Sequence, residues 1–106
     1  MVYLVDTVEV DAADVPAYLR VIETAAVPVM TGAGAAFVSC WSTSSELGED
    51  VGITVVWSFE DHVVWNEIRK NLVLDQRWHA YAKETAALRK RGTRRFYYPA
   101  EFSPLR

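Results

Sequence analysis

The sequence VGITVVWSFEDH, residues 51–62, changes from a strand pattern to a helix pattern within a few positions. Residues 51–57 are rich in β-branched and aromatic side chains, which predicts a strand that is apolar on both faces. Ser58, with Asp61 three residues later, resembles a capping box and predicts a helix start. One helical face then carries Val64, Trp65, Ile68 and Leu72. The stretch predicts a strand that leads directly into an amphipathic helix.

Upstream, the sequence predicts a strand followed by a helix. Residues 2–10 alternate as a strand does, and Asp6 interrupts the apolar residues of one face. A helix is expected to start near Asp14, because Pro16 fits only in a first turn and the apolar spacing that follows is helical. We expect this helical region to end within residues 28–34, which contain one proline and two glycines.

The next segment predicts the second strand of the sheet, which begins a hairpin. Residues 35–43 form this strand, with Phe37, Ser39 and Trp41 expected on one face and the intervening residues on the other. The polar residues 42–50 suit the loop that joins it to the strand at residues 51–57.

The last third predicts one more helix and one more strand. Asp75 is the expected cap of a helix with the apolar stripe Trp78, Tyr81, Ala82, Thr85 and Leu88. Gly92 would follow the helix, so that the cations of residues 89–91 would lie in its last turn. Residues 93–98 are the last strand. The order β-α-β-β-α(α)-β predicts an α+β, ferredoxin-like antiparallel sheet within one domain over residues 1–106.

Composition narrows the function classes. A chain of 106 residues with a net charge of −3 has no excess of basic residues for general binding to nucleic acid or membranes. Cys40 is the only cysteine, which excludes an intrachain disulfide and a cysteine-based metal site. The N-terminus lacks the pattern of a signal peptide and no run of 18 apolar residues occurs, so we expect a cytoplasmic protein.

The predicted sheet needs a partner. In this topology the helices cover one face, and the other face should then be polar. The strand at residues 51–57 is instead apolar on both faces, and the preceding strand carries Phe37 and Trp41. An exposed apolar sheet face is an association site. A second copy, stacked sheet to sheet as a homodimer, is the partner that we expect.

The order of the motifs resembles the NIPSNAP branch of the dimeric α+β barrel families. The resemblance rests on the first strand (residues 2–7), the Trp57 strand end, Trp65, the Asp75 to Trp78 helix start and the ending Phe102-Ser103-Pro104-Leu105. It covers nearly the full chain and implies a dimeric barrel. This sequence departs from the family pattern at Asp6, where an arginine is expected.

The superfamily implied by the resemblance includes cofactor-independent monooxygenases, polyketide cyclases, haem-degrading enzymes and proteins of no known activity. In the enzymes the pocket lies between the sheet and the helices. Trp65 followed by His79 is similar in order to the haem-degrading pattern, although the spacing is longer and the asparagine of their first strand is absent. Haem is therefore a minor alternative, and no dissociable cofactor and no metal are predicted.

Four residues are candidates for catalysis. His79 lies at the margin of a buried stripe and could act as a base or a haem ligand. Asp6 interrupts an apolar face, and a buried carboxylate there could be a general base. Asp6 could instead form a structural ion pair with Arg94 or Arg95 of a neighbouring strand. Tyr97 and Tyr3 could polarise a carbonyl oxygen. Candidate substrate-binding residues are the large rings Trp41, Trp57, Trp65, Trp78 and Phe37.

These observations favour a small-molecule enzyme that acts on a hydrophobic carbonyl, phenolic or polyketide-like substrate by isomerase, cyclase or monooxygenase chemistry. A non-catalytic ligand-binding or interaction module and a haem-binding protein are the alternatives.

Overall fold

The computed structural model describes residues 1–45 and 48–106. Its elements, in chain order, are β1 (Val2–Val10), the 3-10 turn η1 (Ala12–Asp14), α1 (Val15–Val21), the π-helical turn η2 (Ile22–Ala26), α2 (Val27–Ala33), β2 (Ala36–Ser42), β3 (Val51–Phe59), α3 (His62–Leu74), α4 (Gln76–Ala86) and β4 (Arg89–Tyr97). This order confirms the predicted ferredoxin-like pattern. None of the described helices is long and apolar enough to cross a membrane.

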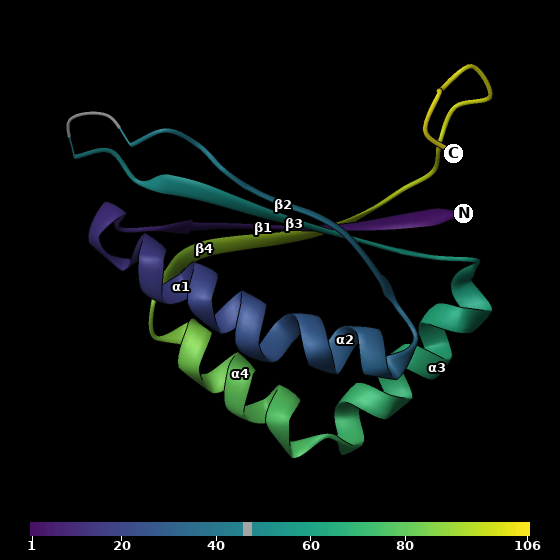
Figure 1. The fold of residues 1–106 in the computed structure, drawn as a ribbon, viewed down its shortest axis with the longest axis horizontal. Helices are drawn as coiled ribbons and strands as arrows, with labels where there is room; N and C mark the ends of the chain where they lie inside the picture. The colour runs from purple at the N-terminus through teal and green to yellow at the C-terminus, as the bar shows by residue number, and fades with distance from the viewer. Residues whose placement is uncertain (46–47) are drawn as a thin grey trace.

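The four strands form one antiparallel sheet in the order β2-β3-β1-β4. All the helices lie on one side of this sheet, and the C-terminal segment leaves it on the other side (Figure 1). We call the two sides the helix face and the outer face. The core lies between the helix face and the helices, where Leu4, Met30, Ile53 and Ile68 are fully buried.

The first helical region runs through Pro28 and ends within the predicted range of residues 28–34. Its turn widens at η2, where the Val27 N–H bonds to the carbonyl of Ile22, five residues back. Because proline has no N–H and its ring clashes with a carbonyl of the preceding turn, a wider turn accommodates it. The helix ends at Gly34, whose φ of +118° is unfavourable for other residues.

Two predicted boundaries are wrong. Ser58 does not cap a helix but lies buried in β3, and the cap of α3 is Asp61, which accepts a hydrogen bond from the Val64 N–H at 3.0 Å. Likewise, α4 ends at Ala86, and Gly92 pairs with β1 inside β4. In both places the strand extends further than predicted because β1 offers a pairing partner along its whole length.

The faces of β2 also differ from the prediction. A β-bulge shifts the register between Phe37 and Ser39, so that Phe37 lies opposite Trp57 on the helix face. Trp41 lies opposite Thr54 on the outer face. The two rings therefore face opposite sides of the sheet. Part of the predicted loop over residues 42–50 lies outside the described residues.

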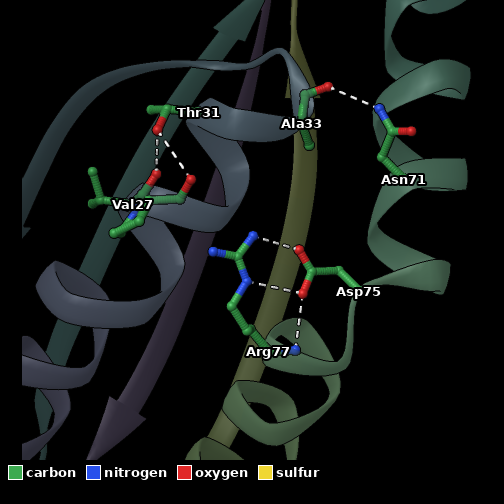
Figure 2. Close-up of polar contacts among 7 residues, drawn as sticks. Val27, Thr31, Ala33, Asn71, Asp75 and Arg77 are labelled. Carbon is green, nitrogen blue, oxygen red and sulfur yellow. Dashed lines mark hydrogen bonds and ion pairs between the residues drawn. The ribbon is translucent and has the colours of Figure 1, made fainter.

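Polar contacts fix how the helices follow one another (Figure 2). Asp75 is the predicted cap of α4: it accepts a hydrogen bond from the Arg77 N–H at 2.9 Å and also pairs with the Arg77 guanidinium at 2.8 Å. The side-chain amide of Asn71 in α3 donates to the carbonyl of Ala33 at the end of α2, at 3.3 Å. The Thr31 hydroxyl donates to the Val27 carbonyl within α2 at 2.7 Å. The Asn71 bond therefore ties α3 to the end of α2, whereas the Asp75 and Thr31 contacts are local to the start of α4 and to α2.

Candidate functional site

A cavity of about 440 Å³ lies between the helix face and the helices, and its size suits a small molecule. β1 and β4 form its sheet side, and α1 and α4 form its helical side. The lining residues are Asp6, Val8, Tyr18, Trp78, Tyr81, Ala82, Thr85, Arg89, Gly92, Thr93 and Arg94.

An ion pair bridges the two strands at the cavity wall. Asp6 and Arg94 are direct cross-strand partners on the helix face. Arg94 Nε donates to Asp6 Oδ1 at 2.7 Å, and Nη2 donates to Oδ2 at 3.1 Å. The guanidinium also lies 5.6 Å from the centroid of the Trp65 ring. This two-point pairing holds the Asp6 carboxylate in one orientation and confirms the predicted pairing with Arg94.

Two tyrosines bring hydroxyl groups to the cavity from different helices. Tyr18 comes from α1 and Tyr81 from α4, and burial raises the pKa of both. The hydroxyl of Tyr18 lies beside Thr85 and Arg89, which lower its pKa less than burial raises it. Both phenols therefore stay protonated near neutral pH and can donate hydrogen bonds. Thr85 is buried and donates to the Tyr81 carbonyl at 2.9 Å.

The other side of the cavity is apolar and aromatic. The Trp78 and Tyr81 rings lie 5.1 Å apart. A smaller hollow of about 30 Å³ adjoins the cavity and shares Asp6, Tyr18 and these two rings. Its other walls include Trp57, at the centre of the sheet. The arrangement can hold a flat apolar body against Trp78 and present hydroxyl and charged groups to an oxygen.

The sequence matches the NIPSNAP family model over residues 3–104. The chain belongs to the NIPSNAP family. No curated protein matches it. The resemblance on which the fold prediction rested is thereby confirmed.

Solved NIPSNAP structures are similar to this chain over their full length. A family member of unknown function from Agrobacterium tumefaciens is 27% identical, with a TM-score of 0.82 over 100% of this chain and 94% of that one. An uncharacterized NIPSNAP domain protein from Burkholderia xenovorans is 22% identical, with a TM-score of 0.81 over 98% and 99%. SnoaB, a cofactor-independent oxygenase from Streptomyces nogalater, shares the fold at 14% identity and a TM-score of 0.62 over 97% and 96%. The fold is thus that of the dimeric α+β barrel proteins.

In this NIPSNAP chain, only part of the predicted site comes together. Asp6 and Trp78 line the cavity, and Trp57 lines the hollow behind it. Trp65 is buried next to them, stacked on Phe59 at 5.5 Å and under the Arg94 guanidinium.

The other candidate residues lie elsewhere. His79 is on the exposed side of α4, outside the cavity, where its ring donates from Nε2 to the Val73 carbonyl at 2.7 Å. Tyr3 and Tyr97 are paired with each other on the outer face, and Trp41 is also there. Phe37 is on the helix face, but it belongs to β2, the edge strand farthest from β4. There it packs on Trp57, with ring centroids 5.5 Å apart. These five side chains do not form one site with Asp6.

Sequence reasoning missed the polar groups of the cavity. Tyr81 and Thr85 belong to the predicted apolar stripe of the last helix, Tyr18 belongs to the first predicted helix, and Arg89 is one of the cations predicted at a helix end. Tyr18, Tyr81 and Thr85 carry hydroxyl groups on helix faces that point to the core. Because a buried hydroxyl needs a hydrogen-bond partner, they indicate a polar site inside the fold. Among the described residues, no group of three potential metal ligands comes together.

Proposed function

We propose that this NIPSNAP protein is a small-molecule enzyme that works without a dissociable cofactor on a hydrophobic carbonyl or phenolic compound. The observation that carries this proposal is the cavity, in which an oriented carboxylate, two protonated phenols and an aromatic wall converge. A base and hydrogen-bond donors are the groups needed for proton transfer next to a carbonyl group.

In this proposal Asp6 is the general base. A carboxylate can accept about four hydrogen bonds, and Arg94 occupies one position on each oxygen. The remaining positions can take a proton from a carbon beside the carbonyl group of a bound molecule. Arg94 keeps the carboxylate in place and so avoids the cost of orienting it during the reaction.

The phenols of Tyr18 and Tyr81 would act on the substrate oxygen. When the proton leaves carbon, negative charge moves to the carbonyl oxygen and an enolate forms. Hydrogen-bond donors already aimed at that oxygen stabilise the charge, and each is worth about 10²-fold or more in rate. Return of a proton from Asp6 to carbon completes an isomerisation or exchange, and leaves no net change in the enzyme.

In a second variant of the proposal, the enolate carbon bonds molecular oxygen and the peroxide takes up a proton. Cleavage of the O–O bond then releases water and leaves one oxygen atom on the carbon as a carbonyl, which is monooxygenase chemistry. SnoaB, with the same fold, is described as a cofactor-independent oxygenase, which supports this variant of the proposal at the level of the fold. Haem binding through His79 gains no support from the arrangement, since its ring nitrogen already bonds to Val73.

The test is hydrogen exchange into an aromatic ketone. Purified protein is incubated with 1-tetralone in deuterated buffer, and loss of the proton signal beside the carbonyl is followed by NMR. We expect exchange above the buffer rate and a drop of about 10²-fold in Asp6→Asn. Oxygen uptake with anthrone, whose methylene group is acidic, then separates the oxygenase from the isomerase or cyclase.

The matched control is Glu9→Gln, which makes the same change of acid to amide in β1 but on the outer face. Its exchange rate should equal that of the unchanged protein. Binding of the ketone without exchange would reject catalysis and favour the non-catalytic binding module. Equal rates in Asp6→Asn and the unchanged protein would reject Asp6 as the base.

We also propose that the protein is a homodimer joined through the outer face. Trp41 is 63% exposed there and Tyr97 is 50% exposed, around the apolar Val5 and Val56. The face also carries charges of both signs, such as Glu9 and residues 91 and 95, which suits contact with an identical face. The C-terminal segment leaves on this side (Figure 1). Its exposed apolar residues are available to cover a second copy.

A further inference from the structure

Arg89 faces the cavity because of a β-bulge. The register between β1 and β4 shifts after Glu9, which pairs with Arg91, so that Val10 pairs with Arg89 and leaves Lys90 without a partner in β1. In a regular strand, Arg89 and Arg91 would lie on the same face. The extra residue instead turns Arg89 to the helix face, where it lines the cavity. Bulges next to functional sites re-aim a side chain in this way.

The bulge itself is held by charges. Lys90 Nζ lies 2.9 Å from Asp11 Oδ1 and 2.8 Å from Asp50 Oδ1, and these two carboxylates raise its pKa. Asp11 follows β1 and Asp50 precedes β3, so that one lysine ties the bulge to two other parts of the sheet's end. The stem of Arg89 passes directly over Gly92, where an added Cβ would lie in van der Waals contact with Arg89 Cδ at 3.4 Å.

Among the described residues, no carboxylate pairs with the positive charge that Arg89 brings to the cavity. Two guanidinium groups line it, but Asp6 is the only carboxylate among its lining residues, and Arg94 holds both oxygens of that carboxylate. Within residues 1–45 and 48–106, Arg89 makes no ion pair. Its neighbours in the cavity include the hydroxyl of Tyr18, which is neutral.

We propose that Arg89 anchors an anionic oxygen group, of carboxylate type, on the aromatic or polyketide-like molecule that the cavity binds. This inference rests on the proposed function and names its substrate class as an aromatic or cyclic acid. The fork of the guanidinium matches a carboxylate at two points. The apolar body of the molecule would lie against Trp78, with its reacting carbon toward Asp6.

The test compares two probes of the same shape. 2-Naphthoate carries the carboxylate, and 2-naphthamide replaces it with a neutral amide. Their dissociation constants are measured by calorimetry on the full chain. We expect the unchanged protein to bind naphthoate about tenfold or more tightly than naphthamide, which is the effect of a charge-assisted hydrogen bond. Arg89→Gln should remove this preference and leave the affinity for naphthamide within about twofold.

Three further variants sharpen the result. Arg69→Gln removes the same charge from an exposed position of α3, outside the cavity and the outer face, and should keep the full preference. Arg89→Lys keeps the charge without the fork and should retain part of it. Lys90→Met releases the clamp on the bulge, so it should reduce the preference for naphthoate while binding of naphthamide is unchanged. A structural role alone would move both affinities together.

The outcomes separate this inference from the proposed function. If both probes bind equally well and Arg89→Gln changes neither affinity, the anion anchor is rejected while the small-molecule cavity stands. A preference for naphthoate that survives Arg89→Gln also rejects it. If neither probe binds, and 1-tetralone shows no exchange, the small-molecule function falls together with the inference.

Discussion

Two ion pairs join the same two strands on opposite faces of the sheet, and they differ in almost every other respect. Asp6 and Arg94, on the helix face, meet at 2.7 Å in a two-point contact, with side chains 24% and 42% exposed. Glu9 and Arg91, on the outer face, meet at 3.6 Å with side chains 45% and 82% exposed. Cover from the helices accounts for the difference, because a partly buried carboxylate needs a fixed partner.

The comparison teaches how the sheet divides its tasks. On the helix face the charges are oriented and lie at the wall of a cavity, which suits chemistry on a small molecule. On the outer face they are loose and lie among exposed rings, which suits contact with another protein surface. The following four predictions test this division, from the largest expected effect to the smallest.

Packing on the helix face should dominate stability. Leu4 is fully buried under the helices, so Leu4→Ala should lower the free energy of unfolding by about 2–5 kcal/mol. Its neighbour Val5 points to the outer face and is half-buried, and Val5→Ala should cost about 1 kcal/mol. Urea unfolding followed by tryptophan fluorescence measures both. Equal losses would contradict the division of the two faces by packing.

A charge at the centre of the outer face should break the proposed dimer. Val56 in β3 lies on the outer face, flanked by β1 and β2, and is 8% exposed, so Val56→Asp should weaken self-association by about 10²-fold or more and also lower the stability of the fold. Sedimentation velocity gives the association state, and circular dichroism reports the fold. Val56→Thr keeps the shape and should stay dimeric. A dimer that survives Val56→Asp would move the interface away from this face.

The two ion pairs should contribute differently to the free energy of unfolding. Asp6→Asn leaves the Arg94 guanidinium without its anion in a partly covered place, and should cost about 1–2 kcal/mol of unfolding free energy after allowance for solvent. Glu9→Gln should change it by less than about 0.5 kcal/mol. Adding Arg94→Gln to Asp6→Asn makes a neutral pair and should recover part of the loss. Thermal unfolding measures the stability of all three variants. A larger loss of stability in Glu9→Gln than in Asp6→Asn would contradict the comparison.

The smallest effect is expected at the α4 cap, in the helix layer. Arg77 lowers the pKa of Asp75 from 3.8 to about 2. A carboxyl group whose pKa is lower in the folded state stabilises the protein above pH 3.8, and this contribution is lost as the pH falls toward about 2. Asp75→Asn should therefore show a smaller loss of Tm between pH 4 and pH 2 than the unchanged protein. Parallel Tm curves for the two would contradict the assignment.

Much of the fold was predictable because its signals are local. The helical stripe of Ile68 and Leu72, the Asp75 cap and the alternation of β1 need only neighbouring residues, and the structure confirms all three. The Asp6 pair with Arg94 was also predictable, because antiparallel pairing of the first and last strands brings those positions together. The candidate site was predicted only in part, since His79 and Tyr97 lie away from the cavity that Asp6 lines.

Errors arose where one strand depends on another that is distant in sequence. A bulge turns Phe37 away from Trp41, and a second bulge turns Arg89 into the cavity. Neither bulge can be seen in the alternation of apolar and polar residues along its own strand. The meeting of Tyr18 with Tyr81 depends in the same way on how α1 and α4 pack against the sheet.

The sequence by itself determined the order of the elements, the family and the apolar character of the strand at residues 51–57 on both faces, because these follow from residue type and short-range spacing. The tertiary structure alone decided which side chains share the cavity. Strand register and bulges come from hydrogen bonding between remote segments, and a shift of one residue moves a side chain from one face of the sheet to the other.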